Sequence, residues 1–462
     1  MKRKQLTAAL LALTLLTGCA ANAPTPSEPA VVTEPSVATE PAGQTDAVDI
    51  LLSDDGVVCD SDAVYTKNDI LYESDDDAGT HTPEEAAAHT VVHITAPGVY
   101  RVTGTLSAGQ LFVDLGENAQ DDPNACVTLL LDDAQLTCTV APAILFYRVY
   151  ECAPGEDFTL TPDLSDAGAV LTLADGSFNL ANGAVASRVS MRFEGDTGSL
   201  TINAADEGLT AEHHLEINGG NLTIAAQDDG INADADELSV MTINGGLLSI
   251  TGGRDEEGDG IASDGALVIN GGTVFASANE HSGTGLAADC GIYLNGGTVV
   301  ATGSRNDSAE RASKQQFMEL CFAQLVQQGS TLCIKNGDTV LLEDTVARPF
   351  TSLTFSVPEL ETGVAYTVTV NGVVQQHGAG RFPEGMDLEP PTEGRGPGEF
   401  EIPEPPGGMD QPVISVEGSR NDAQPAQADG ALRVRPDGET AVSQDFTLTE
   451  TGHSFWNVRD AE

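Results

Sequence analysis

A four-residue signature recurs at nearly constant spacing and constrains the fold more than any other feature of the chain. It reads Ile-Asn-Gly-Gly at 217–220, 243–246 and 269–272, and Leu-Asn-Gly-Gly at 294–297, so its period is 26, 26 and then 25 residues. A fixed period in this range is typical of a solenoid, in which each coil buries its apolar face only by stacking on its neighbours. The chain is therefore predicted to be a repeat protein.

Short alternating stretches lie between the signatures, for example 222–224, 247–250 and 298–300. Such runs predict β-strands, whereas Asn-Gly-Gly in every repeat interrupts any helix. We therefore predict an all-β fold, a right-handed single-stranded parallel β-helix. Stacking would place equivalent side chains about 4.8 Å apart. The asparagines that we expect to form such a ladder, with a structural role and no chemistry, are Asn218, Asn244, Asn270 and Asn295.

An acidic signature recurs opposite the first. It reads Asp-Glu-Gly-Leu at 206–209, Asp-Asp-Gly-Ile at 228–231 and Asp-Gly-Ile at 259–261, with a degenerate version, Thr-Gly-Leu, at 284–286. Two carboxylates at the spacing of adjacent coils repel by roughly 1 kcal/mol in water, and by several times more where water is partly excluded. A row of such groups favours a bound cation.

Further acids flank the same turns, and no His or Cys converges with them. Carboxylates and the carbonyls of glycine turns are the ligands that Ca²⁺ prefers. The residues that we predict to bind it are Asp206, Glu207, Asp228, Asp229, Asp234, Asp236, Asp255 and Asp259, with the first two as an outer site. The alternative is a solvated acidic turn, because Asp-Gly is also ordinary turn chemistry.

The N-terminus has the features of a secretion signal. A basic start, Met-Lys-Arg-Lys, precedes an apolar run over 6–16 that is too short to span a membrane. The following Leu-Thr-Gly-Cys at 16–19 is similar to a bacterial lipobox. This similarity implies a signal peptide over 1–18, diacylglycerol on the sulfur of Cys19, and a mature protein anchored by lipid at the extracellular face of the cell membrane. The composition of residues 19–47, which is rich in Pro, Thr, Ala and Glu, predicts a disordered tether.

The net charge disfavours partners that are themselves strongly negative. The 462 residues have a formal net charge of −51, which becomes −54 when Lys2, Arg3 and Lys4 leave with a signal peptide. Nucleic acids and anionic lipid surfaces are therefore poor partners unless a metal ion intervenes.

Seven cysteines remain after the anchor, and their spacing matches no zinc pattern. We favour small apolar packing over disulfides for Cys126, Cys138 and Cys152. A disulfide between Cys321 and Cys333 is left open.

The composition divides the chain into further segments. We assign 48–304 to the β-helix, with 48–90 as its N-terminal cap. Residues 305–378 predict a capping element, in which 313–327 has helical composition and the rest reads as strands. A linker rich in Pro, Gly and Glu follows over 379–412, and 413–462 is predicted to be a tail with short strands.

Taken together, the segments between 48 and 372 resemble a family of secreted bacterial carbohydrate-binding β-helix proteins. The stretches that carry the resemblance are APGVYRVTGTL at 96–106, VTLLLDDAQL at 127–136, the DDGI and INGG coils, and LETGVAYTVTVNG at 360–372. The family is similar in fold to pectate lyases. The resemblance implies bound calcium and binding of cellulose or acidic pectic polymers without established cleavage.

We therefore predict a non-catalytic, calcium-dependent lipoprotein that binds an acidic polysaccharide as a monomer. Cellulose is less supported, because the regular coils offer few aromatic platforms beyond Phe275 and Tyr293. The first alternative is a calcium-dependent polysaccharide lyase, whose base would be Arg254, but the acids at 255–257 favour an ion pair that keeps this arginine protonated. The second alternative is a structural adhesin.

Overall fold

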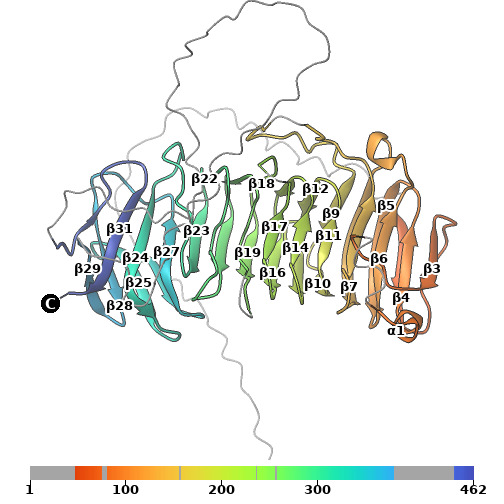
Figure 1. The fold of residues 1–462 in the computed structure, drawn as a ribbon, viewed down its shortest axis with the longest axis horizontal. Helices are drawn as coiled ribbons and strands as arrows, with labels where there is room; N and C mark the ends of the chain where they lie inside the picture. The colour runs from red at the N-terminus through yellow and green to blue at the C-terminus, as the bar shows by residue number, and fades with distance from the viewer. Residues whose placement is uncertain are drawn as a thin grey trace, which may run out of the picture. The chain divides into compact units, whose positions relative to one another are not determined.

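The computed structural model describes residues 47–74, 81–155, 158–235, 237–254, 258–378 and 442–461. All of them belong to one compact unit, Asp46–Glu462 (Figure 1). The predictions that concern Cys19, the tether over 19–46, the linker and the ligands Asp236 and Asp255 lie outside the described residues.

The described part of the chain is almost entirely β-structure. It contains 31 strands, one short α-helix, α1 (Pro83–Ala88), and one turn of 3-10 helix (Ala119–Asp121). Of these strands, 24 form one sheet and seven form another. No helix among the described residues is long and apolar enough to cross a membrane.

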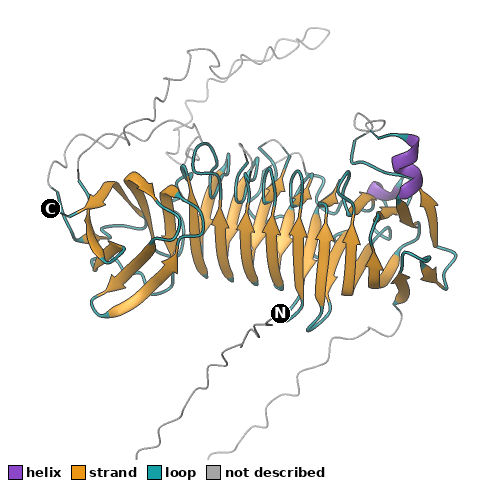
Figure 2. Cartoon of the chain, turned by 90° about the horizontal axis from the view of Figure 1, so that it is seen from below, coloured by secondary structure: helices purple, strands orange, loops and turns teal. Residues whose placement is uncertain are grey.

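Three parallel ladders organise the middle of the chain (Figure 2). Ladder 1 comprises β10 (Phe178–Asn182), β13 (Ser199–Asn203), β16 (Asn221–Ala225), β19 (Leu247–Thr251), β21 (Thr273–Ser277) and β23 (Thr298–Gly303). Ladder 2 comprises β9 (Ala169–Leu173), β12 (Met191–Glu194), β15 (Leu215–Ile217), β18 (Val240–Ile243), β20 (Ala266–Ile269) and β22 (Gly291–Leu294). Each repeat of about 26 residues contributes one strand to each of them.

Ladder 3 is the parallel part of the seven-stranded sheet. It comprises β4 (Thr90–Ile94), β6 (Gly109–Asp114), β8 (Ile144–Arg148), β11 (Val185–Ser187), β14 (Leu209–Ala211) and β17 (Ile231–Ala233). Isolated bridges at Ile261 and Leu286 continue it. At its other end β3 (Val64–Asn68) pairs with β4 in antiparallel fashion and ends the parallel pairing.

The opening strands extend the larger sheet. They are β1 (Val48–Leu52), β2 (Val58–Cys59), β5 (Gly98–Leu106) and β7 (Val127–Thr137). Parallel pairs join β1 to β5, β5 to β7, and β7 to both β9 and β10. The parallel pairing therefore runs from Val48 to the end of β23.

The inward side chains of the ladders meet in one continuous apolar core, because each strand alternates between inward and outward positions. The isoleucine of the recurring signature is an example. Ile217, Ile243 and Ile269 occupy one register position and are fully buried. Stacking of identical positions thus makes one core from many short strands.

The asparagines of the signature form a hydrogen-bonded ladder. The Nδ2 of Asn244 donates to Oδ1 of Asn218 at 2.8 Å, Asn270 donates to Asn244 at 2.9 Å, and Asn295 donates to Asn270 at 3.0 Å. The second glycine of each signature has φ between +82° and +94°, a conformation that favours glycine. Both parts of the signature therefore serve the turn.

A second apolar core lies in the C-terminal element. Its strands are β24 (Phe317–Val326), β25 (Thr331–Asn336), β26 (Thr339–Thr345), β27 (Phe350–Ser356), β28 (Ala365–Val370), β29 (Val373–Gln376), β30 (Phe446–Thr447) and β31 (His453–Asp460). Strand β27 pairs with β23 in antiparallel fashion, so it covers the last edge of ladder 1.

The helix predicted over 313–327 is wrong, because the structure places strand β24 there. This strand lies between β27 and β31 and is buried on both faces, so its sequence lacks the alternation that marks a half-buried strand. The short strands predicted in the C-terminal segment are present as β30 and β31. Within 442–461, Phe446 and Phe455 belong to the second core.

All seven cysteines after Cys19 are free thiols. Cys321 and Cys333 therefore form no disulfide. Cys138 packs in the main core as a small apolar residue, as expected.

Candidate functional site

The turns that join ladder 1 to ladder 3 stack in register. The amide of Gly208 donates to the carbonyl of Asp229, that of Gly230 to Asp259, and that of Gly260 to Thr284, each at 2.9 Å. The residues that precede these three glycines, Glu207, Asp229 and Asp259, therefore occupy equivalent positions, and we call them the acidic row.

Glycine is required in these turns because successive coils approach closely. A Cβ on Gly230 would lie 2.3 Å from Cγ2 of Ile250 and 2.5 Å from the carbonyl oxygen of Gly260. No side chain fits in that space without movement of the backbone. The same glycines that mark the acidic signature in the sequence thus hold its carboxylates at the spacing of the coils.

Main-chain amides hold two members of the acidic row. Oδ1 of Asp229 accepts from the amide of Asp259 at 2.6 Å, and Oδ1 of Asp259 accepts from the amide of Thr284 at 2.6 Å. Burial, with the charges of Asp259 and Asp228, raises the pKa of Asp229 to about 7. Burial also raises the pKa of Asp259, against the hydrogen bonds from Thr284 and the charge of Arg305.

A second group of acids surrounds Asn232 on β17. Its Nδ2 donates to Oε1 of Glu207 at 3.1 Å and to Oδ1 of Asp234 at 2.6 Å. Only 9% of Asn232 is exposed, and its Oδ1 has no hydrogen-bond partner among the described residues. Burial and the charge of Glu207 raise the pKa of Asp234 to about 7. Burial likewise raises the pKa of Glu207.

Glu73 joins this group from a distant part of the sequence. The segment that carries it is fixed at Leu71, whose amide donates to Oε1 of the buried Gln110 at 2.7 Å and whose carbonyl accepts from Nε2 at 3.0 Å. Burial, with the charges of Glu207 and Asp234, raises the pKa of Glu73 to about 7. Asp234 is more exposed than Glu73, so water screens its charge more strongly.

Neither Glu73 nor Asn232 is among the ligands predicted from the sequence. The acidic run at 73–77 is visible there, but nothing in the repeat pattern places it beside Glu207. Asn232 stands two residues after the recurring Asp-Asp-Gly. Its equivalent in the neighbouring coil is Thr210, so the repeat pattern does not single it out. Its unpaired oxygen is visible only in three dimensions.

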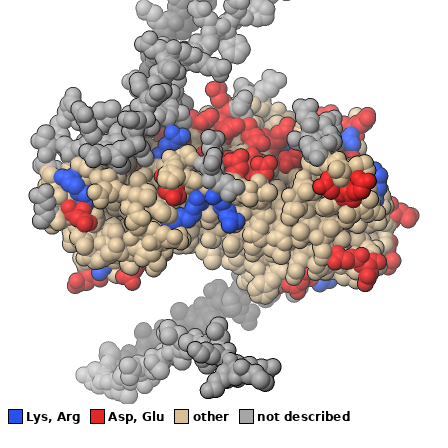
Figure 3. Space-filling view, turned by 60° about the horizontal axis from the view of Figure 1, so that its bottom comes forward, with Lys and Arg blue, Asp and Glu red and all other residues tan. Residues whose placement is uncertain are grey.

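The predicted ligands thus divide into those that the structure brings together and those that it does not. Glu207, Asp229 and Asp259 line the stacked turns, and Asp234 lies beside Glu207 at Asn232. Asp206 and Asp228 are exposed beside them and act on the pKa of Glu207 and Asp229 through charge. Among the described residues, no three acidic, His or Cys side chains converge closely enough to hold a metal ion by themselves. Figure 3 shows a cluster of Asp and Glu at the upper centre of the view, with smaller acidic groups elsewhere on this face.

The basic residues near the acidic row have structural partners. Arg348 donates from Nη1 to the carbonyl of Gly252 at 2.6 Å and from Nη2 to that of Gly253 at 2.9 Å, and burial lowers its pKa. This contact ties the C-terminal element to a coil. Arg254 is exposed. Its predicted ion pair with the acids at 255–257 lies outside the described residues and stays a prediction.

The parallel ladders and the acidic row belong to an all-β protein, which the comparison with known families places in the carbohydrate-binding class. The chain belongs to the family of carbohydrate-binding domain-containing proteins, whose model matches residues 88–345, more than half of the chain. This match confirms the resemblance at the level of the family. Calcium and the lipid anchor stay predictions.

Two known proteins are similar to this chain. A carbohydrate-binding domain-containing protein of Acetivibrio thermocellus is 28% identical over 155 residues, which are 32% of this chain and 50% of the relative. The chain therefore spans about half the length of the curated relative that it matches. The solved structure of a polysaccharide lyase-like protein from C. thermocellum, a gadolinium derivative, is 21% identical, with a TM-score of 0.41 over 57% of this chain and 93% of that one.

Proposed function

We propose that this chain is a non-catalytic lipoprotein that binds an acidic, pectic polysaccharide through Ca²⁺ at the acidic row. Membership of the carbohydrate-binding family supports polysaccharide as the partner. The observation that carries the calcium part is the set of oxygen atoms around Asn232. Two carboxylates, the half-buried Glu207 and the exposed Asp234, lie beside a buried carbonyl oxygen that has no hydrogen-bond partner among the described residues, and this set matches the ligand preference of a hard cation.

The donor set fits a cation that protein and glycan share. Glu207, Asp234 and Oδ1 of Asn232 would supply protein oxygens to one ion, and Asp229 with Asp259 would supply them to another. Ca²⁺ takes six to eight oxygen ligands, so a site with this few protein donors leaves positions for the carboxylates of a polysaccharide. When bound, the ion supplies the positive charge that an acidic protein needs to attract an acidic polymer.

Binding without cleavage is favoured by the state of the arginines. A lyase needs a base that can take a proton from the sugar. Arg348 has a lowered pKa, but its guanidinium donates to two carbonyls and holds the C-terminal element in place. A role as a mobile proton acceptor conflicts with this structural task.

The remaining parts of the proposal concern topology and address. The three parallel ladders are proposed to be the faces of a right-handed β-helix. Cys19 is proposed to carry the lipid that holds the chain at the extracellular face of the cell membrane. Incorporation of a labelled fatty acid into the wild type, and its loss in Cys19→Ser, tests the anchor.

The decisive experiment mixes the purified chain with polygalacturonate, in millimolar calcium or in chelator. Co-precipitation reports binding, and ultraviolet absorbance of unsaturated sugars reports cleavage. We expect binding only in calcium and no product. Binding that persists in chelator contradicts the calcium mechanism, product identifies a lyase, and the absence of both signals favours adhesion to another surface.

A further inference from the structure

The outward side of ladder 1 is uncharged between β10 and β21. On each of these five strands the second and fourth residues are buried and the other three point outward. These outward residues, which we call the neutral face, are Phe178, Leu180, Asn182, Ser199, Thr201, Asn203, Asn221, Thr223, Ala225, Leu247, Ser249, Thr251, Thr273, Phe275 and Ser277. None of them is acidic or basic, although the chain has a net charge of −51.

The neutral face is regular in both directions. Its residues align in columns across the strands, one of which contains Phe178, Asn221 and Leu247. Phe275 lies in the next column, beside Ser249. The exposed fractions of Phe178, Leu247 and Phe275 are 75%, 47% and 37%, so the face presents three large apolar side chains to solvent.

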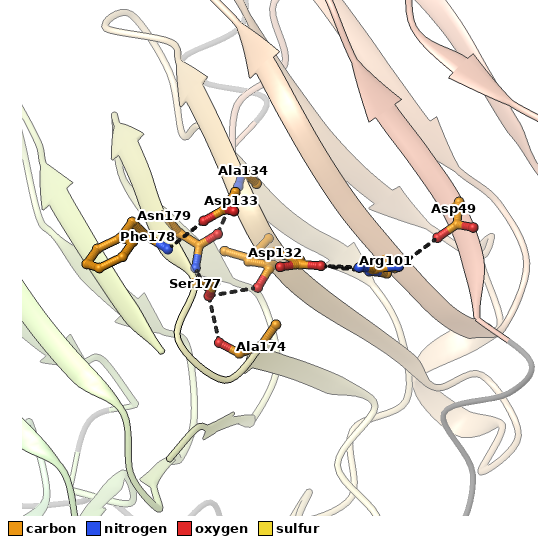
Figure 4. A network of polar contacts seen from close by, with 10 residues as sticks. Asp49, Arg101, Asp132, Asp133, Ala134, Ala174, Ser177, Phe178 and Asn179 are labelled. Atoms are coloured by element: carbon orange, nitrogen blue, oxygen red, sulfur yellow. Dashed lines mark hydrogen bonds and ion pairs between the residues drawn. The ribbon is translucent and has the colours of Figure 1, made fainter. Parts of the chain in front are cut away.

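The backbone that presents Phe178 is held by a polar network (Figure 4). The amide of Phe178 donates to Oδ1 of Asp133 at 2.9 Å. The next residue, Asn179, is buried, and it accepts from the amide of Ala134 at 2.9 Å and donates to Oγ of Ser177 at 2.7 Å. In Figure 4 the ring of Phe178 points away from this network. The aromatic ring is therefore exposed on a fixed support.

The hydroxyl groups in the centre of the face are available to a ligand. Thr201, Thr223 and Ser249 follow one another in one column. Their hydroxyls make no hydrogen bond to another described residue. In the neighbouring column, by contrast, Asn203 donates to Asn182 at 3.0 Å and Ser277 bonds Thr251 at 3.2 Å.

We propose that the neutral face binds a flat, uncharged polysaccharide and is a second binding surface, separate from the acidic row. The inference rests on the proposed binding of polysaccharide. Sugar rings present apolar C–H faces, which pack on aromatic and aliphatic side chains, and hydroxyls at their edges, which bond to Thr, Ser and Asn. A face without charges loses no ion hydration when it is covered.

Charge also decides against the other occupants. A second copy of this chain would bring another net charge of −51 close to the first, and the two copies would repel. An acidic polymer finds no cation site on the neutral face. Tyr293, the other aromatic candidate from the sequence, is not part of this surface, because it lies in ladder 2 and packs against the apolar cluster of Val240, Ala266 and Val268.

The test measures retention of the purified full chain on microcrystalline cellulose in chelator, where the acidic row holds no calcium. The variants are Thr223→Asp, which places a charge in the centre of the face, and Phe178→Ala with Phe275→Ala. Tyr65→Ala is the matched control, because Tyr65 is 49% exposed on β3, away from the face. We expect the wild type and the control to be retained, and each neutral-face variant to lose about tenfold in affinity.

Two results overturn the proposal. The first is the loss of the expected difference in retention on cellulose: either the wild type stays in the supernatant, or the variants are retained as strongly as the wild type. The other is a wild-type dimer that Thr223→Asp converts to a monomer, which assigns the face to a second copy. Failure of the calcium mechanism gives a different pattern, because it abolishes calcium-dependent binding of polygalacturonate and leaves retention on cellulose in chelator unchanged.

Discussion

The neutral face and the acidic row are made by the same coils, yet they differ completely in charge. Thr223 and Asp229 are only six residues apart in one coil, and each stacks on equivalent residues in the coils beside it. Stacking repeats whatever a position carries. Uncharged side chains stack at little cost, whereas carboxylates in these turns lose hydration and repel one another. Burial, with the charges of Asp259 and Asp228, raises the pKa of Asp229 for this reason. An acidic row is therefore a burden on stability unless a cation relieves it.

The largest expected effect of this contrast is a dependence of stability on pH in chelator. Glu73, Asp229 and Asp234 have pKa values of about 7 in the folded chain, above those of unfolded carboxyls. The folded state therefore binds more protons between about pH 4 and pH 7, and the free energy of unfolding falls as the pH rises through this window. Denaturant unfolding at several pH values measures it.

Other titrating groups, one variant and added calcium show whether these carboxylates cause the pH dependence. Asp69 and Asp163 have lowered pKa values, so they titrate below the window. Burial lowers the pKa of His93 and His214, so these two groups make the free energy of unfolding rise with pH within the window and oppose the carboxylates. Glu73→Gln removes one of the three groups and should make the slope shallower. Calcium should restore stability above about pH 7. A profile in chelator that Glu73→Gln leaves unchanged would contradict the raised pKa of this carboxyl group.

Gly230→Ala separates spacing from charge. The added methyl group meets Ile250 and the carbonyl of Gly260 and forces the coils apart, so we expect a loss of about 2–4 kcal/mol in the free energy of unfolding. The matched control is Thr223→Ala on the neutral face of the same coil, with a change within about 0.5 kcal/mol. Equal stability of the two variants would contradict the close approach at the turn.

Asp229→Asn with Asp234→Asn removes charge without changing shape. We expect calcium-dependent affinity for polygalacturonate to fall at least about tenfold, or 1.4 kcal/mol. Stability in chelator should rise at the same time, because two charges that each repel Glu207 are gone. Asp338→Asn, in an exposed turn of the C-terminal element, is the control. If the double variant binds as the control does, the acidic turns are solvated and bind no ion.

The parts of the molecule that follow from local repetition are predictable from the sequence. The isoleucines, asparagines and glycines of the signature have equivalent positions because each coil repeats the last, so their ladder follows from the period alone. The same reasoning places Glu207, Asp229 and Asp259 in one row. In each case the neighbour in space is the equivalent residue of the next coil.

The parts that depend on distant segments are not predictable in this way. Strand β24 has helical composition, and its partner β31 comes from the far end of the chain. Glu73 reaches the acids around Asn232 because Gln110 fixes a segment that lies outside the regular repeats. The uncharged residues of the neutral face can be read from the sequence. That these residues point outward is shown only by the burial of the residues between them.

The sharpest version of the comparison places acids on the neutral face. Thr201→Asp and Thr223→Asp each add one exposed charge, and each alone should change stability by less than about 0.5 kcal/mol. Together they stand in adjacent coils at one register position, so they should repel by roughly 1 kcal/mol beyond the sum of the single changes. A double-mutant cycle in low salt measures this coupling, and salt should weaken it. The pair thus places two stacked carboxylates in adjacent coils, as in the acidic row, but without a ligand oxygen such as Oδ1 of Asn232 nearby. Calcium should relieve the repulsion there less than it stabilises the natural row; equal rescue at both places would show that the natural turns offer a cation nothing beyond two stacked charges.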